Sequence, residues 1–237
     1  MPKFLNSQQA KKIDQLLMGD KYRFRLAQLM EMASLSCAGA ARHYLVHEMK
    51  KKQATILALV GPGNNGGDCA CAARHLKLFG FECDLWIPKE PKNEFYKDLI
   101  QQCRVMGIPL IEGGAEAVSD EKLRKYDLVL DGIFGFSFEG DIRDPYASII
   151  DKVKKSNIPV FSIDVPSGWN VDEGNDTGKG FEAQALISLT APKMCAKSFK
   201  GMHYLGGRFV PPSLAREFDL DLPEFEADSS WTIISRI

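Results

Sequence analysis

The chain has 237 residues, of which 45% are hydrophobic and 26% are charged, and its formal net charge is −1. This length fits one sizeable α/β domain, and the composition is ordinary for a globular protein. A net charge so close to zero gives no electrostatic case for binding nucleic acid or an anionic membrane. No apolar run in the sequence reaches the roughly 18–20 residues that a membrane span requires.

The first 50 residues are expected to form a helical N-terminal segment. Ser7 is placed to cap a first helix, and a second helix is predicted from about Arg25 to Lys50. Residues 1–7 lack the apolar core of a signal peptide, so we expect a cytoplasmic location for the chain as given.

From residue 54 to residue 210, apolar strand-like segments alternate with helix-like segments. Strands are expected at residues 54–60, 81–87, 108–111, 126–130, 158–163 and 186–190. Helices are expected at residues 69–79, 93–106, 119–125 and 146–156. This alternation predicts a mainly parallel sheet that is covered on both faces.

The last part of the chain follows Pro211 and Pro212. A short helix is predicted at residues 213–218, and the acidic end beyond it is predicted to be a loose arm. Residues 1–237 are therefore treated as a single domain, with a helical segment (1–50), an α/β core (54–210) and a C-terminal helix and tail (211–237).

The cysteine pattern predicts buried, reduced thiols. None of the six cysteines forms a Cys-x-x-Cys pair, and most lie in apolar surroundings, which disfavours a disulfide or zinc set. They are Cys37, Cys69, Cys71, Cys83, Cys103 and Cys195.

The most informative stretch is the glycine-rich segment at residues 61–68, GPGNNGGD. An apolar run precedes it and a helix-like segment follows it, which predicts a strand, a turn and a helix that bring backbone N–H groups close to phosphates. The glycine spacing also matches the dinucleotide fingerprint. However, no acid at the end of the second strand is placed to hold a ribose, which disfavours a hydride-transfer cofactor.

Four predicted strands end in polar residues and glycines. These ends are residues 64–68, 131–141, 164–169 and 191–193. Ligands of open parallel sheets bind at the carboxyl ends of the strands, so the four segments predict one binding site at this edge.

Three acids, Asp68, Asp131 and Asp164, are predicted to share a small volume at this site. Carboxylates so close together raise each other's pKa, unless one stays protonated, a basic side chain enters or a cation binds. Asn65, Asp131 and Ser167 offer only hard oxygen ligands, which favours an alkali or alkaline-earth ion over zinc or copper. The residues alone leave the choice between these solutions open.

Several motifs of the chain resemble those of the NAD(P)HX epimerases, the YjeF N-terminal domain family, which includes the apolipoprotein A-I-binding protein. The resemblance covers nearly the whole chain, and its motifs occur in the family's order. They are GPGNNGGD at 61–68, ARHL at 73–76, IFGFS at 133–137, DVPSGW at 164–169, LTAPK at 189–193 and HYLGGRF at 203–209.

The resemblance implies a three-layer αβα, Rossmann-like sandwich, usually as a homodimer. It implies an isomerase that repairs nicotinamide nucleotides by interconverting R- and S-NAD(P)HX, the hydrated forms of NADH and NADPH. A separate dehydratase, specific for the S form, then restores the cofactor. By analogy with the family, mitochondrial or secreted forms of the protein are the alternatives to the cytoplasmic location.

Carried over residue by residue, the resemblance places the potassium ligands on Asn65, Asp131 and Ser167, with one K⁺ per subunit. The same comparison makes Asp164 a substrate contact. The other implied substrate contacts are Asn64, Asn65, Gly66, Gly67, Asp68, Gly135, Phe136, Ser137, Phe138, Glu139, Gly140 and Asp141.

Inversion at C6 of the nicotinamide ring needs a positioned acid and base. We expect Asp164 to be the principal proton-transfer group, with help from Asp68 or a water. Lys193 is expected either to neutralise this edge of the sheet, to contact a phosphate, or to be solvated. A non-catalytic binding protein on the same fold, with an apolipoprotein or another protein as partner, is the main alternative. A sugar or nucleotide kinase ranks below it, because no phosphate-binding Lys loop is present.

The chain departs from the family pattern at two positions. Cys69 and Ser34 stand where the family usually has glycine. A side chain at position 69 could crowd the substrate and would place an oxidisable thiol beside the site, although a tolerated small residue in the first helical turn is favoured.

Overall fold

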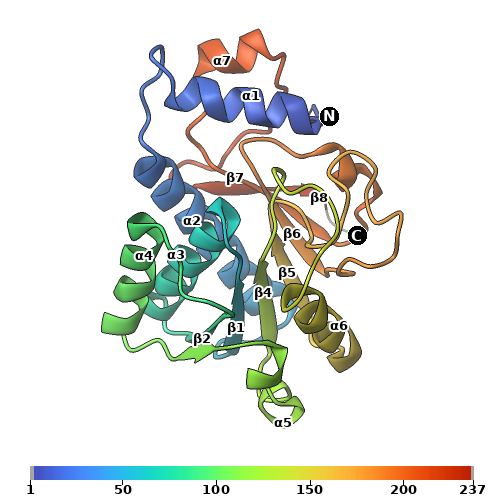
Figure 1. Cartoon of the computed structure of the whole chain (residues 1–237). Coiled ribbons are helices and arrows are strands. Elements are labelled where there is room, and N and C mark those ends of the chain that lie inside the picture. The colour runs from blue at the N-terminus through green and yellow to red at the C-terminus, as the bar shows by residue number, and fades with distance from the viewer. Residues whose placement is uncertain (1–2, 236–237) are drawn as a thin grey trace.

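In the computed structural model, which describes residues 3–235, one eight-stranded sheet organises the chain (Figure 1). The strand order is β3-β2-β1-β4-β5-β6-β7-β8; β1 to β7 run parallel, and β8 is antiparallel to β7. The strands are β1 (Thr55–Val60), β2 (Glu82–Ile87), β3 (Leu110–Glu112), β4 (Leu128–Gly132), β5 (Val160–Ile163), β6 (Ala185–Leu189), β7 (Met202–Gly206) and β8 (Trp231–Ser235).

Helices cover both faces of the sheet, which confirms the predicted three-layer αβα architecture. α2, α3 and α4 pack on one face, and α5 and α6 on the other. The helices are α1 (Ser7–Met18), α2 (Leu26–His43), α3 (Asn64–Leu78), α4 (Glu94–Val105), α5 (Asp120–Leu123), α6 (Tyr146–Ser156) and α7 (Pro212–Glu217), and a π-helical segment, Tyr44–Glu48, continues α2. No helix among residues 3–235 is both long and apolar enough to cross a membrane.

β1 shows why these residues form a central strand. Its side chains alternate between the two layers, with Ile56 and Ala58 facing α2 and α3, and Leu57 and Leu59 facing the α6 layer. All four are fully buried. A strand that is buried on both faces reads as a continuous apolar run, as this one does in the sequence.

The strand order reverses direction between β1 and β4. From β1 the chain winds outward to β2 and β3, and after returning to β4 it winds the other way through β5, β6 and β7. In open α/β sheets, the crevice at such a reversal, beyond the carboxyl ends of the strands, is where ligands bind. The topology therefore places the loops after β1 and β4 beside each other at the expected binding position.

α1 and α7 lie side by side beyond this edge of the sheet (Figure 1). Ile13 and Leu17 of α1 are fully buried in the same cluster as Leu214 of α7. The N-terminal segment is also fixed by backbone hydrogen bonds, from Leu5 N to Pro192 O (2.8 Å) and from Met194 N to Leu5 O (2.9 Å). α1 is thus held next to the segment that follows β6.

Most predicted elements are found with bounds within two residues, and four predictions need correction. The end of the chain is not a loose arm, because β8 pairs with β7. α3 begins at Asn64, so residues 64–68 lie in its first turns rather than in a loop before it. Asp131 lies within β4 instead of after it, and the cap of α1 is Asn6 rather than Ser7, with a capping box to Gln9.

Candidate functional site

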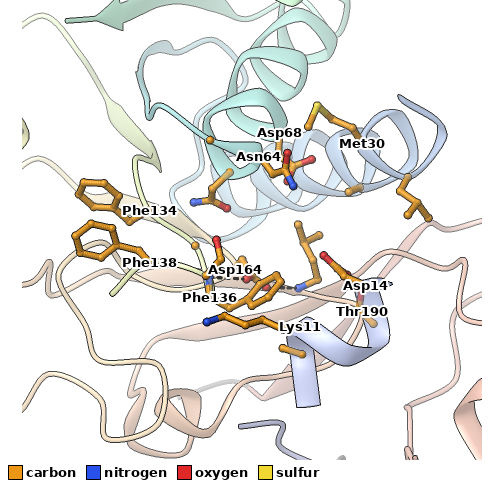
Figure 2. Close-up of a pocket in the computed structure, with 18 of the residues that line it drawn as sticks. Lys11, Asp14, Met30, Asn64, Asp68, Phe134, Phe136, Phe138, Asp164 and Thr190 are labelled. Carbon is orange, nitrogen blue, oxygen red and sulfur yellow. Dashed lines mark hydrogen bonds between the residues drawn. The ribbon is translucent and has the colours of Figure 1, made fainter. Parts of the chain in front are cut away.

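A cavity of about 530 Å³ opens at the carboxyl ends of the strands (Figure 2). Its walls come from α1, α2, the start of α3, residues 133–138 after β4, and the segments after β5 and β6. Side chains far apart in the sequence meet here, among them Asp14, Asn64, Asp68, Asp164 and Lys193. The predicted site at this edge of the sheet is therefore a real hollow in the structure.

The glycine-rich segment forms the start of α3, and its glycines have different roles. A Cβ at Gly61 would lie 1.7 Å from Ile133 O, and one at Gly66 would lie 1.9 Å from Gly61 O. These two glycines therefore allow the loop to pack tightly against β4 and do not face a ligand. Gly63, in contrast, lines the cavity and has open space where a Cβ would be, and it precedes the first amides of α3.

Asn64 and Asn65 point to different neighbours from these first turns. Tyr96 donates a hydrogen bond to Asn64 Oδ1 (2.6 Å). Asn65 donates through Nδ2 to the Ile163 carbonyl (3.2 Å), which leaves its Oδ1 as an acceptor. Both asparagines line the cavity, as predicted from the sequence.

Asp164 and Lys193 form a buried ion pair at the base of the cavity. Lys193 Nζ contacts Asp164 Oδ1 and also donates to the Leu189 carbonyl (2.8 Å). The two residues are 3% and 2% exposed. Lys193 is thus the basic side chain that enters the acidic site, and it is neither solvated nor free to leave its partner.

The backbone at Asp164 is in the left-handed region, with φ of +66°, as it is at Thr190 (+68°). Such a conformation is unfavourable for a residue other than glycine, although Asp and Asn tolerate it best. The conformation is held by the surrounding contacts, since Leu189 N donates to Asp164 Oδ1 (3.2 Å) and Phe136 N to Oδ2 (3.4 Å). Strained residues that line a cavity are a common feature of functional sites.

Asp68 is buried on α3 next to Ser34 of α2, whose hydroxyl lies 3.5 Å from Asp68 Oδ1. Burial raises the pKa of the Asp68 carboxyl well above its usual range, and the carboxylates of Asp164 and Asp14 raise it further. Burial therefore favours the protonated form of Asp68, whereas Asp164 has Lys193 as its ion-pair partner. Two of the three solutions that the sequence left open, a carboxyl that favours its protonated form and a basic side chain that enters the site, thus occur together.

Asp14 is a cavity residue that the sequence analysis missed. It lies on α1 and faces the same space as Asp68 and Asp164 (Figure 2). Burial raises its pKa to about 6; Lys193 lowers the pKa and Asp164 raises it. The only signal in the sequence was an acid beside Ile13 on an amphipathic helix, which is also typical of a solvated position.

Aromatic side chains complete one wall of the cavity. The rings of Phe134 and Phe138 stack with centroids 3.8 Å apart. Lys193 Nζ lies 5.2 Å from the centroid of the Phe136 ring, so this ring covers the ion pair. An aromatic face next to a buried ion pair can stack a planar ring beside the reactive groups.

Asp131 lies beneath this site and does not line the cavity. It is fully buried and accepts four hydrogen bonds, from Ser162 Oγ (2.8 Å), Ser167 N (2.8 Å), Ser167 Oγ (2.5 Å) and Ile133 N (3.2 Å). Burial raises its pKa, and these hydrogen bonds lower it. The expectation that Asp131 shares one volume with Asp68 and Asp164 is thus wrong, because its position within β4 points it into this network.

The predicted substrate loop divides between two hollows. Gly135, Phe136, Ser137 and Phe138 line the main cavity. The next residues of the loop, 139–141, line a separate hollow together with residues that follow β5, and Glu139 pairs with Lys11 at the surface. Gly66 and Gly67 do not line the main cavity either, since they lie within α3.

Cys69 faces the sheet and not the cavity. A Cβ at Gly132 would lie 2.2 Å from Cys69 Cβ, so glycine in β4 leaves the room that this side chain needs. The thiol is fully buried, and burial raises its pKa well above its usual range. The tolerated-residue interpretation is therefore supported, and no reactive thiol lies beside the site. All six cysteines are buried and free, as predicted.

The family model for the YjeF-related protein N-terminus matches residues 26–195. The chain belongs to this family. The YjeF N-terminal match spans α2 to the segment after β6, and therefore includes most of the cavity. Asp14 and α1 lie outside it.

Curated YjeF N-terminal relatives extend the similarity to nearly the whole chain. A protein of Dictyostelium discoideum named NAD(P)H-hydrate epimerase is 44% identical over 234 residues, which are 98% of this chain and 97% of that protein. A Puccinia graminis f. sp. tritici protein of the same name is 44% identical over 235 residues, 99% of this chain and 95% of that protein. The crystal structure of yeast YNL200c has a TM-score of 0.89 at 35% identity and covers 98% of this chain and 100% of its own.

Proposed function

We propose that this protein is an NAD(P)H-hydrate epimerase, an isomerase that interconverts R- and S-NAD(P)HX. The structural observation that carries the proposal is the buried Asp164–Lys193 pair, which opens into a cavity beside the start of α3. Relatives that are 44% identical over nearly their whole length carry this name. The non-catalytic alternative is not favoured, because four of the expected site residues, Asn64, Asn65, Asp68 and Asp164, line one cavity.

The cavity offers separate places for two parts of a dinucleotide, the diphosphate and the nicotinamide ring. The first amides of α3 and the open Gly63 suit a diphosphate, since a helix N-terminus attracts anions. Phe136 covers the ion pair and suits the nicotinamide ring. In this arrangement the dinucleotide is the substrate, and C6 of its ring lies near Asp164.

Epimerisation at C6 must break and remake a bond at that carbon. The C6–O bond breaks as an acid protonates the oxygen and the lone pair of N1 forms a C=N bond, and water is released. Water then adds to the other face of C6 and gives its proton to a base. Opening of the ring between N1 and C6 also requires an acid and a base. Asp164 is the proposed proton-transfer group, because it faces the cavity and Lys193 stabilises its charged form.

The donor set of Asn65, Asp131 and Ser167 fits a potassium ion. All three offer oxygen atoms, and the contacts of the fully buried Asp131 within residues 3–235 include no Lys, Arg or His side chain. We propose that these residues hold K⁺, which would supply the positive charge that the Asp131 carboxylate lacks. Asn65 would link this ion to the cavity, since it belongs to both.

We also propose a homodimer, as in similar proteins, and coupling to a dehydratase that uses the S epimer. Light scattering of the purified protein tests the oligomeric state. An S-specific dehydratase added to R-NADHX should restore NADH faster when this protein is present.

The direct test of the proposed activity uses purified protein and separated R-NADHX. Conversion to the S form is followed by chromatography in KCl and in choline chloride, with a protein-free sample as the background. We expect rapid equilibration of the two epimers in KCl and slower equilibration without K⁺. A rate equal to the background in both salts would contradict the proposed function.

A further inference from the structure

Asp14 is a carboxylate that faces the cavity without a partner of its own. Within residues 3–235, its carboxylate forms no hydrogen bond and no ion pair, although the side chain is largely removed from solvent. An unpartnered, half-buried carboxylate is unfavourable for the folded state and calls for an explanation.

The position of Asp14 is fixed by its helix. Ile13, its neighbour in the sequence, is fully buried, and Leu17 is buried one turn later. The segment before α1 is hydrogen-bonded to the backbone on both sides of Lys193. These contacts therefore hold α1, and Asp14 with it, against the cavity.

Asp14 and Asp164 reach the cavity from different elements. Asp164 follows β5 at the base of the cavity, whereas Asp14 comes from α1, beyond the end of the sheet (Figure 2). Inversion at a carbon requires proton transfer on both faces of the ring, because the departing oxygen leaves one face and the new oxygen arrives on the other. Two carboxylates that line one cavity and come from separate elements can supply the acid and the base that this chemistry needs.

We propose that Asp14 is a second catalytic residue of the epimerase, which acts on the opposite face of the nicotinamide ring from Asp164. In one direction Asp14 donates its proton to the C6 hydroxyl as the C6–O bond breaks, and water leaves as the N1 lone pair forms the C=N bond. Water then adds on the other face, and Asp164 takes its proton. In the reverse direction the two carboxylates exchange roles.

This arrangement predicts a pH dependence. The charged or titratable groups facing Asp14 are Lys11 on its own helix, Asp68 of α3, Asp164 after β5 and Lys193 after β6. Burial raises the pKa of Asp14 to about 6, so its acid form is lost as the pH rises through 6. The reactive state carries one proton shared between Asp14 and Asp164, so kcat/KM should fall above that pH.

The test compares Asp14→Asn with the wild type, and with Asp14→Glu as the conservative variant. Asp20→Asn, an exposed acid just after α1, is the control. Rates from R-NADHX and from S-NADHX are measured between pH 5 and 9, and NADPH binding is measured by calorimetry. We expect Asp14→Asn to lower kcat by about 10²- to 10⁴-fold with NADPH binding changed less than about threefold. The fall of kcat/KM near pH 6 should be absent in Asp14→Asn, and Asp14→Glu should keep part of the wild-type rate.

The proposal rests on the proposed function, and the outcomes separate the two. A wild-type rate at the background level contradicts the activity itself, and with it the role of Asp14. An active wild type with an equally active Asp14→Asn variant overturns the role of Asp14 alone, as does a variant that only raises KM. Thermal unfolding provides a check on folding. Since ionised Asp14 is disfavoured in the folded state, stability should fall as the pH rises through 6 in the wild type, and Asp14→Asn should raise the Tm above pH 6.

Discussion

The two buried acidic sites at the strand ends are stabilised in different ways. At the end of β5, Asp164 is paired with Lys193 and opens into the cavity. Within β4, Asp131 is enclosed by four hydrogen-bond donors and has no access to the cavity. Asp164 follows β5 and Asp131 lies within the neighbouring strand β4, yet Asp164 lines the cavity and Asp131 is part of the framework.

The comparison teaches that a strand-end carboxylate is not reactive by position alone. Asp164 combines an ion pair with a left-handed backbone that turns it toward the cavity. Asp131 accepts hydrogen bonds at both oxygens from within the fold, so its carboxylate holds the loop that carries Ser167. Substitutions at the two positions should therefore fail in different ways.

The largest effect is expected for Asp164→Asn. Asn tolerates the left-handed backbone, so the loop conformation should survive, whereas proton transfer is lost. We expect kcat to fall by about 10²- to 10⁴-fold, measured by chromatography of the epimers. Because Lys193 loses its buried partner, the free energy of unfolding should also fall, by about 3–5 kcal/mol in urea titrations.

A matched double variant separates the two losses. Asp164→Asn combined with Lys193→Met removes the unpaired charge, so stability should recover while the rate stays low. A double variant as active as the wild type would remove Asp164 from the mechanism. If Asp164→Asn were no less stable than the wild type, the ion pair would not have the structural importance assigned to it.

Asp131→Asn is expected to reduce stability first and activity second. An amide can accept at only one oxygen, and its NH₂ group would face donors from Ser162 or Ser167, which costs about 1–3 kcal/mol for each unsatisfied group. K⁺ should raise the Tm of the wild type relative to choline, and this increase should vanish in the variant. An unchanged Tm response to K⁺ in Asp131→Asn would contradict the proposed ion site.

Much of the site could be predicted from local patterns in the sequence. Asn64, Asn65 and Asp68 follow an apolar run, and Asp164 follows another, so the geometry of parallel strands was sufficient to bring them to one edge. The separation of Asp131 was not predictable in this way. Its orientation depends on which residue of β4 is the last to point away from the crevice, and a strand bound that shifts by one residue reverses that direction.

Asp14 and β8 were missed because both depend on contacts distant in the sequence. Asp14 reaches the cavity because Ile13 and Leu17 pack against α7 and the backbone of Leu5 pairs with the segment around Lys193. β8 pairs with β7, and its Trp231 packs against His43 and Tyr204, which are distant in the sequence. Neither of these long-range contacts produces a periodic pattern in its own segment. The sequence therefore did not predict where α1 and the C-terminal tail would pack.

Ser34→Ala is expected to have the smallest effect, and it tests the third carboxyl group of the cavity. The Ser34 hydroxyl lies 3.5 Å from Asp68 Oδ1, at the outer limit of a hydrogen bond, and this contact lowers the pKa of Asp68 against the larger effect of burial. Its removal should raise that pKa further, change kcat/KM by less than about fivefold and change stability by less than about 1 kcal/mol.

A double-mutant cycle with Asp68→Asn measures this coupling directly. If Ser34 acts through Asp68, Ser34→Ala should alter kcat/KM in the wild type but not in the Asp68→Asn background. Equal effects in both backgrounds would show that Ser34 acts through helix packing. A 100-fold loss of kcat/KM in Ser34→Ala alone would instead mean that the Ser34 hydroxyl positions Asp68, as Lys193 positions Asp164. Of the three acids that line the described cavity, Asp14 would then be the one without such a partner.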